Sequence, residues 1–151
     1  MGHSLNRITL VATLHCLTGC AIGEVLGMVI GTALGWSDWQ TVALAVGLAF
    51  LFGYSFTLVP LVRSGLALAA ALPIALAADT VSIAVMEVVD NAVMLMVPGA
   101  MEAGPANGLF WGALAFALAV AFVVAFPVNR WLIARGRGHA VVHGGHAHHG
   151  A

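Results

Sequence analysis

The chain consists of long apolar stretches separated by short polar segments. Polar and apolar residues seldom alternate one by one along it. Four stretches are long enough to cross the hydrocarbon layer of a bilayer as helices, which takes roughly 20 apolar residues each. They cover approximately residues 8–35, 41–61, 66–96 and 109–133. The pattern therefore predicts an all-α fold, a bundle of four transmembrane helices.

Short polar segments mark the ends of these stretches. The segment WSDWQ, residues 36–40, separates the first two, and its tryptophans suit a membrane interface. A loop over residues 98–108 separates the last two. The third stretch is long for one span, and Pro73 near its start predicts a kink or a re-entrant break.

The last residues differ in composition from the rest. Residues 1–137 form the predicted transmembrane domain, and residues 138–151 form a glycine-rich and histidine-rich tail that we expect to be disordered in the cytoplasm. Its histidines are His139, His143, His146, His148 and His149. Neutral imidazoles chelate divalent metals, so the tail is either a metal-binding segment or a spacer without a function.

Composition supports the membrane assignment. The chain has 151 residues, of which 62% are hydrophobic and 7% are charged, and its mean hydropathy is +1.04. These values lie far from those of soluble domains. The net charge of −1 comes with no basic stripe, which excludes a nucleic-acid partner and leaves membrane lipid as the expected environment.

The basic residues all lie at the ends of the four stretches that would face the same side of the membrane. They are Arg7, Arg63, Arg130, Arg135 and Arg137, whereas Asp38 and Glu102 occupy the opposite loops. Cytoplasmic ends of membrane helices retain positive charge. We therefore expect both termini to be cytoplasmic, in a multi-pass protein of a bacterial or archaeal cytoplasmic membrane.

Glycines recur every fourth residue along the first stretch. The series consists of Gly19, Gly23, Gly27, Gly31 and Gly35. Small residues at this spacing let helix backbones approach closely in lipid. The stripe predicts a tight helix contact, either within the chain or between protomers of a homo-oligomer.

Ionisable residues also lie inside the predicted spans. Four of the six acidic residues do so: Glu24, Asp79, Glu87 and Asp90. An acidic side chain at the membrane centre costs about 2.5 to 3.5 kcal/mol on insertion scales, and no arginine lies deep enough to pair with these four. The carboxyl groups must therefore hold a proton or coordinate a cation.

Possible metal ligands surround these acids. On the first and third stretches they are His15, Cys16, Cys20, Glu24, Met28, Asp79, Met86, Glu87, Asp90, Asn91 and Met94. Thiol and thioether ligands favour copper, and imidazole and carboxylate extend the choice to zinc or iron. The cysteines lie one turn apart in the cytoplasmic half of a span, so we expect free thiols and no disulfide.

Two stretches carry a family resemblance. HCLTGCAIGEVLGM (residues 15–28) and ADTVSIAVMEVVDNAVML (residues 78–95) resemble a family of small four-span bacterial and archaeal membrane proteins catalogued as a domain of unknown function. The resemblance covers about residues 8–133 and implies the four-helix fold. It implies no activity, ligand set or residue role.

The sequence leads to three hypotheses about function. The first is binding and translocation of a cation, with a transition metal ion such as copper favoured, by a homo-oligomer. The second is a proton channel or relay that uses the same carboxyl groups. The third is a subunit that stores metal for a membrane redox complex without transporting it. An enzyme is not expected, because no catalytic or nucleotide-binding motif occurs.

Overall fold

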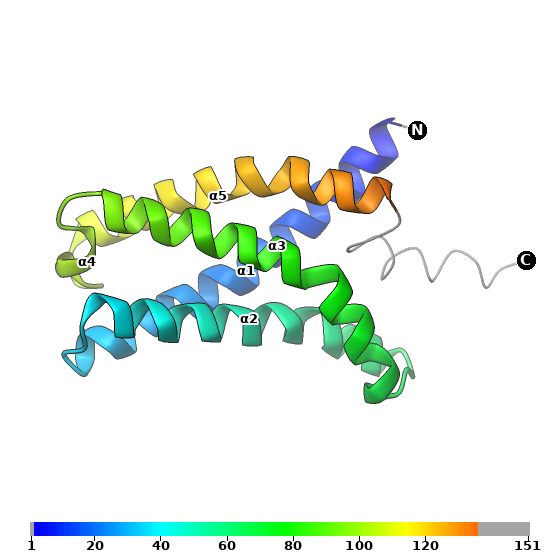
Figure 1. Cartoon of the computed structure of the whole chain (residues 1–151), viewed down its shortest axis with the longest axis horizontal. Helices are drawn as coiled ribbons and strands as arrows, with labels where there is room; N and C mark the ends of the chain where they lie inside the picture. The colour runs from blue at the N-terminus through cyan, green and yellow to red at the C-terminus, as the bar shows by residue number, and fades with distance from the viewer. Residues whose placement is uncertain (1, 136–151) are drawn as a thin grey trace, which may run out of the picture.

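The computed structural model describes residues 2–135 and consists of helices joined by short turns (Figure 1). The helices are α1 (Gly2–Ala33), α2 (Asp38–Arg63), α3 (Leu68–Met96), α4 (Ala100–Ala103) and α5 (Gly108–Ala134). All but α4 are long and apolar enough to cross a membrane. The predicted all-α bundle of four spanning helices is confirmed. Helix α1 begins at Gly2, several residues before the predicted span, and the loop predicted over residues 98–108 contains the short helix α4.

Polar and apolar side chains are distributed as in a protein surrounded by lipid. Large apolar residues lie on the outside, for example Val88 and Val123, which are 70% and 69% exposed. Charged and polar residues such as Glu24 and Asn129 lie in the interior, each 1% exposed. The chain is thus a multi-pass membrane protein whose apolar surface contacts lipid and whose core holds the polar groups.

The turn between α1 and α2 is specified by its local sequence. Gly35 has φ +68°, and the N–H of Trp36 donates to the carbonyl oxygen of Gly31 at 2.9 Å, which ends α1. Ser37 and Gln40 then cap the start of α2 reciprocally. Gly35 therefore caps a helix and makes no helix contact, which corrects the prediction that it continues the glycine stripe.

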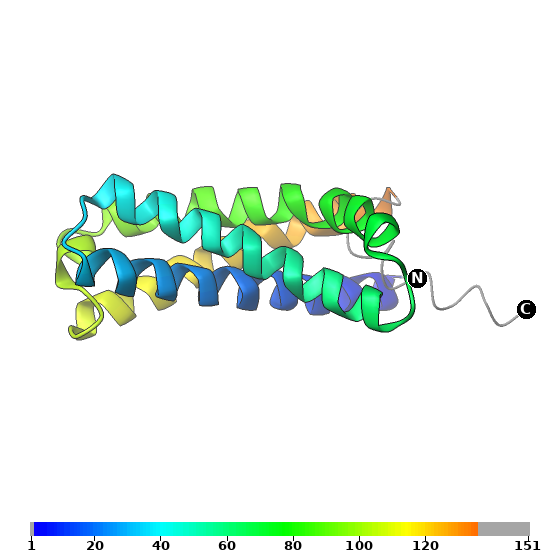
Figure 2. The same cartoon turned by 90° about the horizontal axis from the view of Figure 1, so that it is seen from below.

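The glycine stripe joins α1 to α2 within the chain. Its members Gly19, Gly23, Gly27 and Gly31 face Gly53, Ala49, Ala45 and Thr41, respectively. A methyl group on Gly23 or Gly27 would collide with the backbone of α2. Figure 1 shows the two helices close together near their shared turn, which is also visible in Figure 2, and diverging toward the opposite end of the bundle. An oligomer contact would have to use another surface.

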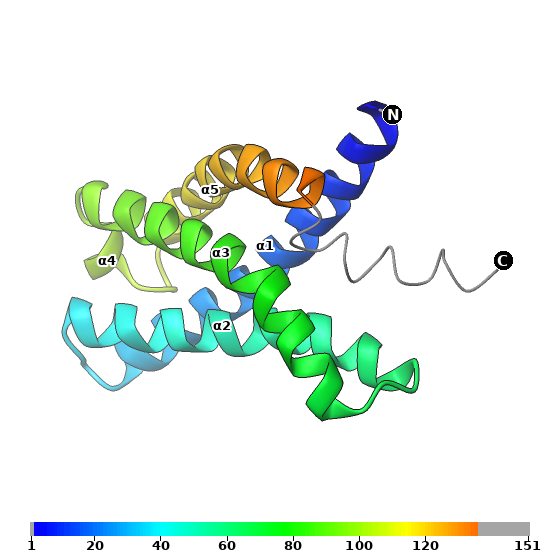
Figure 3. The same cartoon turned by 45° about the vertical axis from the view of Figure 1, so that its right-hand side comes forward.

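The bundle places α1 and α3 across the core from each other. Helix α2 contacts both of them on one side, and α5 contacts both on the other (Figures 1 and 3). The start of α1, the α2–α3 turn and the end of α5 lie at the same end of the bundle, where Arg130 Nε donates to Asn6 Oδ1 at 2.8 Å. We call this the arginine end. The opposite end, with Asp38 and Glu102, is the loop end.

Helix α3 remains helical through Pro73, so the predicted re-entrant break is absent from this helix. Figure 1 shows instead that its first turns are angled away from the remainder. Proline lacks an N–H and its ring crowds the preceding turn, which accounts for a bend. The rest of α3 then runs toward the α4 end of the bundle and crosses α1 (Figures 1 and 3).

Candidate functional site

Helices α1 and α3 run in the same direction and place their polar residues at matching levels. Ser82 Oγ donates to Cys16 Sγ at 3.3 Å, across a separation of 66 residues. Glu24 and Asp90, at the same separation, interact directly. Met86 packs in one buried group with Cys20, and Met94 packs in another with Met28.

Three carboxyl groups gather in the middle of the bundle. Glu24 comes from α1, and Glu87 and Asp90 come from α3; we call them the carboxyl cluster. They are 1%, 4% and 2% exposed. Their charges act on one another, and no basic side chain among the described residues contributes at any of the three. The cluster is an acidic site buried in the core.

The carboxyl cluster has more hydrogen-bond acceptors than donors. Asn91 Nδ2 donates to Glu87 Oε2 at 3.2 Å and to the Glu87 carbonyl oxygen at 2.9 Å. Both carboxyl oxygens of Glu24 and of Asp90, and Asn91 Oδ1, are buried without a hydrogen-bond partner within 3.5 Å. Unpaired buried acceptors are costly. A proton or another cation at this point would remove that cost.

Sulfur atoms lie on both sides of the carboxyl cluster. Toward the arginine end, Cys16, Cys20 and Met86 pack in one buried group, in which Cys20 interacts with Cys16 and with Glu87. Toward the loop end, Met28 and Met94 pack together with Phe110. Both cysteines are free thiols.

Hydrogen-bonded polar side chains from different helices lie on the arginine-end side of the cluster. Beyond Cys16 and Ser82, Asn129 of α5 donates from Nδ2 to Thr13 Oγ1 at 3.0 Å, and Asn129 Oδ1 has no partner. Thr13 in turn donates to the carbonyl oxygen of Thr9 at 2.7 Å. On the other side the apolar residues around Met28, Met94 and Phe110 close the core. Polar side chains therefore lie at intervals between the cluster and the arginine end, whereas apolar side chains pack on its loop-end side.

The sequence interpretation missed Asn129 and Thr13. Thr9 and Thr13 extend the four-residue spacing of Cys16, Cys20 and Glu24 almost without interruption, which was a usable signal. Asn129 is a polar residue inside an apolar span. Its partner is 116 residues away, so only the fold reveals the contact.

His15 lies apart from the cluster. Its Nε2 is 3.0 Å from the carbonyl oxygen of Phe56 on α2, and the two rings are 5.4 Å apart. That carbonyl would normally accept from residue 60, but Pro60 has no N–H to donate. His15 thus supplies a hydrogen bond that the helix itself lacks, and the structure does not bring it together with the other candidate ligands.

Across residues 2–135, no three histidine, cysteine, aspartate or glutamate side chains converge closely enough to hold a metal ion. The candidate ligands that share the core are instead the sulfur and carboxyl groups already described. Arg137 and the five tail histidines lie outside the described residues.

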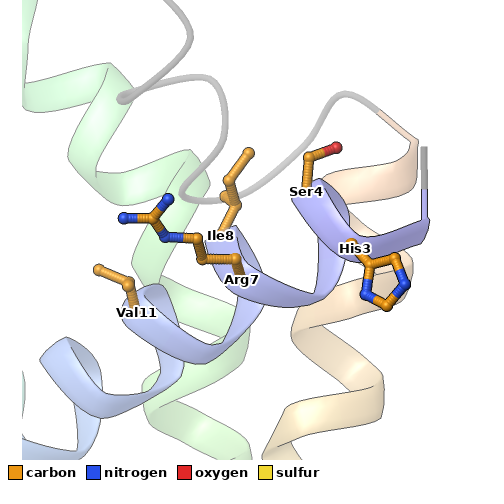
Figure 4. Close-up of a pocket in the computed structure, with 5 residues that line it drawn as sticks. All are labelled: His3, Ser4, Arg7, Ile8 and Val11. Atoms are coloured by element: carbon orange, nitrogen blue, oxygen red, sulfur yellow. The ribbon is translucent and has the colours of Figure 1, made fainter.

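Surface hollows differ in their relation to the cluster. A hollow of about 540 Å³ on the first turns of α1 is lined by His3, Ser4, Arg7, Ile8 and Val11 (Figure 4). At about 1.5 Å rise per residue, Glu24 is about 25 Å from Arg7 along the helix. A groove of about 310 Å³ between α2 and α3 does reach the cluster, since Glu87 and Asn91 line it.

Four spanning helices around a buried acidic site define a small polytopic membrane protein with ionisable groups at membrane depth. The chain belongs to the family described as Domain of unknown function (DUF4396), whose family model matches residues 6–138. This confirms the family resemblance seen in the sequence. No curated protein and no solved structure matched the chain.

Proposed function

We propose that this protein binds and translocates a cation across the membrane, and that the proton is the cation for which the carboxyl cluster is built. The observation that carries the proposal is the pair Glu24 and Asp90, buried together with four carboxyl oxygens that lack donors. Intramembrane carboxyl groups of this kind serve proton relays in pumps and transporters.

The geometry favours a proton over a hard metal ion. A metal such as calcium requires six to eight oxygen ligands, whereas a proton requires one acceptor and satisfies two when it is shared. Glu24 and Asp90 act on each other directly, so they are the pair between which we expect a proton to move. Glu87, held by Asn91, is the third acceptor of the relay.

The distribution of polar groups suggests the order of events. A proton reaches the cluster from the arginine end along the groups around Asn129, Thr13 and Cys16. It leaves toward the loop end only when the apolar residues at Met28, Met94 and Phe110 separate. The carboxyl cluster would therefore be accessible to protons from one end at a time, and both routes would meet at the cluster.

A second candidate cargo is a soft transition metal, with copper favoured over zinc or iron. The supporting observation is the buried packing of Cys16, Cys20 and Met86 beside the cluster, since two thiols and a thioether suit monovalent copper. Met28 and Met94 would be the next ligands along the core. A subunit that stores metal for a redox complex would use the same sulfur atoms without transport.

The setting of the proposed activity follows from the arginine distribution. We place the arginine end in the cytoplasm of a bacterial or archaeal cell, because positively charged segments stay on that side. The protein would work as a homo-oligomer without enzymatic activity. Its protomers would meet on a surface other than the α1–α2 contact, because the glycine stripe is already used there.

Proton flux into proteoliposomes that contain a pH-sensitive dye tests the proposal. We expect Glu24→Gln and Asp90→Asn each to reduce the flux at least tenfold. The matched controls are Asp38→Asn and Glu102→Gln, which remove carboxyl groups at the loop end and should leave the flux unchanged. If both cluster variants fold and conduct like the wild type, the proposal fails.

The metal alternative has a separate readout. Copper content of the purified protein, measured by elemental analysis, should fall to background in the double variant Cys16→Ser and Cys20→Ser if the sulfur atoms bind the cargo. Proton flux should persist in that variant if the carboxyl groups act alone. Bound copper with no flux of either ion would favour the storage role.

A further inference from the structure

The side-chain amide of Asn129 has an oxygen that the bundle leaves without a hydrogen-bond donor. Asn129 lies on α5 and is 1% exposed. Its Nδ2 donates to Thr13 Oγ1 at 3.0 Å, whereas its Oδ1 has no partner among the described residues. A buried acceptor without a donor is costly. An occupant that satisfies Asn129 Oδ1 would therefore stabilise this part of the core.

The hydrogen bonds of Thr13 fix the orientation of this amide. Thr13 Oγ1 donates its hydrogen to the carbonyl oxygen of Thr9 at 2.7 Å, so it can only accept from Asn129. A reversed amide would bring two acceptors, Thr13 Oγ1 and Asn129 Oδ1, face to face. A hydroxyl oxygen has two lone pairs, and Asn129 Nδ2 uses one of them. Thr13 Oγ1 thus keeps a second lone pair for a ligand.

The contact between α1 and α3 places Asp79 near Thr13. Ser82 Oγ donates to Cys16 Sγ, and the two helices run in the same direction (Figure 1). Asp79 and Thr13 each precede that contact by three residues, which is about 4.5 Å toward the arginine end. Asp79 is 1% exposed and Thr13 is 0% exposed. Both side chains therefore stay inside the bundle, one turn beyond a contact between their helices.

The packing of α3 against α5 leads to the same placement. Ile83 of α3 and Ala125 of α5 belong to one buried group, and these two helices run in opposite directions (Figure 1). Asp79 and Asn129 each lie four residues, about one turn, from that group toward the arginine end. Thr13, Asp79 and Asn129 thus come from three helices to one level of the core. We call them the oxygen site.

The ligands at the oxygen site suit a small monovalent cation. They are a carboxyl group, an amide oxygen and a hydroxyl oxygen, and oxygen ligands favour hard cations over copper or zinc. Calcium takes six to eight oxygen ligands, more than these three side chains supply. A single carboxylate matches the charge of an alkali-metal ion. Water is the competing occupant, because it too can satisfy Asn129 Oδ1.

The oxygen site is separate from the carboxyl cluster. Glu24 is eleven residues beyond Thr13 on α1, which corresponds to about 16 Å along the helix. In the other direction, Arg135 at the end of α5 is six residues from Asn129, or about 9 Å. An ion from the arginine end would therefore meet the oxygen site before the cluster.

We propose that Thr13, Asp79 and Asn129 form a binding site for an alkali-metal cation in the half of the core nearer the arginine end. Asn129 Oδ1 and the second lone pair of Thr13 Oγ1 bind the ion, and the Asp79 carboxylate balances its charge. No covalent bond changes. The proposal goes beyond the proposed function, because the site shares no residue with the carboxyl cluster and requires no movement of protons.

Equilibrium binding of radioactive sodium to the full chain in nanodiscs, with choline as the replacement cation, tests this site. We expect saturable binding of about one sodium ion per chain. Asn129→Leu, Thr13→Val and Asp79→Asn each alter one ligand and should weaken sodium binding at least tenfold. Thr13→Ser keeps the hydroxyl group and should bind sodium like the wild type. So should Thr18→Val, which removes a hydroxyl that bonds within α1 to the Leu14 carbonyl oxygen.

Thermal unfolding separates loss of the ligand from loss of the fold. Sodium should raise the unfolding temperature of the wild type relative to choline, because it binds the folded state. The shift should disappear in Asn129→Leu, Thr13→Val and Asp79→Asn once circular dichroism and size-exclusion chromatography show that each is folded. If sodium does not bind the wild type, or binds equally to the folded ligand variants, the site is refuted and water is the better occupant.

The outcomes also separate this site from the proposed function. Glu24→Gln should lower proton flux and leave sodium binding unchanged. If sodium binds as expected but no proton flux occurs in proteoliposomes, the cation site stands and proton translocation fails. Normal proton flux without saturable sodium binding refutes the cation site alone.

Discussion

His15 Nε2 lies 3.0 Å from the carbonyl oxygen of Phe56, the oxygen that Pro60 leaves without its helical donor. A carbonyl oxygen only accepts, so Nε2 carries the hydrogen. The histidine and the proline are distant in sequence, but their effects are complementary. Pro60 leaves the Phe56 carbonyl oxygen without a helical donor, and His15 supplies a donor to it.

We predict that His15→Ala lowers the free energy of unfolding by about 1 kcal/mol, the usual worth of such a hydrogen bond. In a Pro60→Ala background the same change should cost clearly less, because an alanine at that position has a backbone N–H that can donate to the carbonyl oxygen of Phe56 within α2. Reversible unfolding in mixed micelles would measure the coupling, with His3→Ala as a control. Equal costs in both backgrounds would contradict the assignment.

The α1–α2 contact gives a second prediction. Gly23→Ala and Gly27→Ala introduce a methyl group against the backbone of α2, so each should destabilise the fold by about 1 to 3 kcal/mol. Gly47→Ala and Gly112→Ala are matched controls, because nothing lies within 4 Å of the added methyl group at either position. Thermal unfolding in detergent would distinguish the two pairs, and similar shifts in all four variants would refute the contact.

The polar connection toward the arginine end predicts a difference between two threonines. Thr13→Ala removes the hydroxyl group that accepts from Asn129, whereas Thr18→Ala removes one that bonds only within its own helix. We expect Thr13→Ala to reduce proton flux several-fold and Thr18→Ala to leave it near the wild-type value. Dye-loaded proteoliposomes provide the measurement. A loss of similar size in both would mean that the hydroxyl at Thr13 has no special role.

The apolar residues at the loop end predict an opposite effect. Phe110 is buried beside Met28 and Met94, so Phe110→Ala opens space in the layer that separates the cluster from that end. Proton flux should rise in this variant, while Phe116→Ala, which alters a ring that is 59% exposed, should have no effect. Unchanged flux in a folded Phe110→Ala protein would show that the layer is not the barrier.

The hydrophobic pattern of the sequence predicted most of the fold, because a helix that crosses lipid must be long and apolar. The lengths of the four stretches therefore located the four helices. The four-residue spacing of glycines likewise predicted a close contact. The sequence did not determine which helix these glycines contact, because small residues can pack against many different helices.

The site was harder to predict from the sequence, because it depends on how α1 and α3 are aligned against each other. Nothing local to α1 or α3 fixes the separation of 66 residues that sets Cys16 beside Ser82, and so Glu24 beside Asp90. His15 was grouped with the candidate ligands by its position next to Cys16, yet it points to α2 because Pro60 frees an acceptor there. Such relationships arise only after helices have packed.

The one-sided arrangement of polar groups has an electrical consequence. A transmembrane voltage falls mainly across material that does not polarise, and in this bundle that material is the layer around Met28, Met94 and Phe110. The field does about 2.3 kcal/mol of work per elementary charge for each 100 mV that the charge crosses. If a proton crosses the bundle as proposed, it would gain or lose most of this energy in one short step next to Glu24.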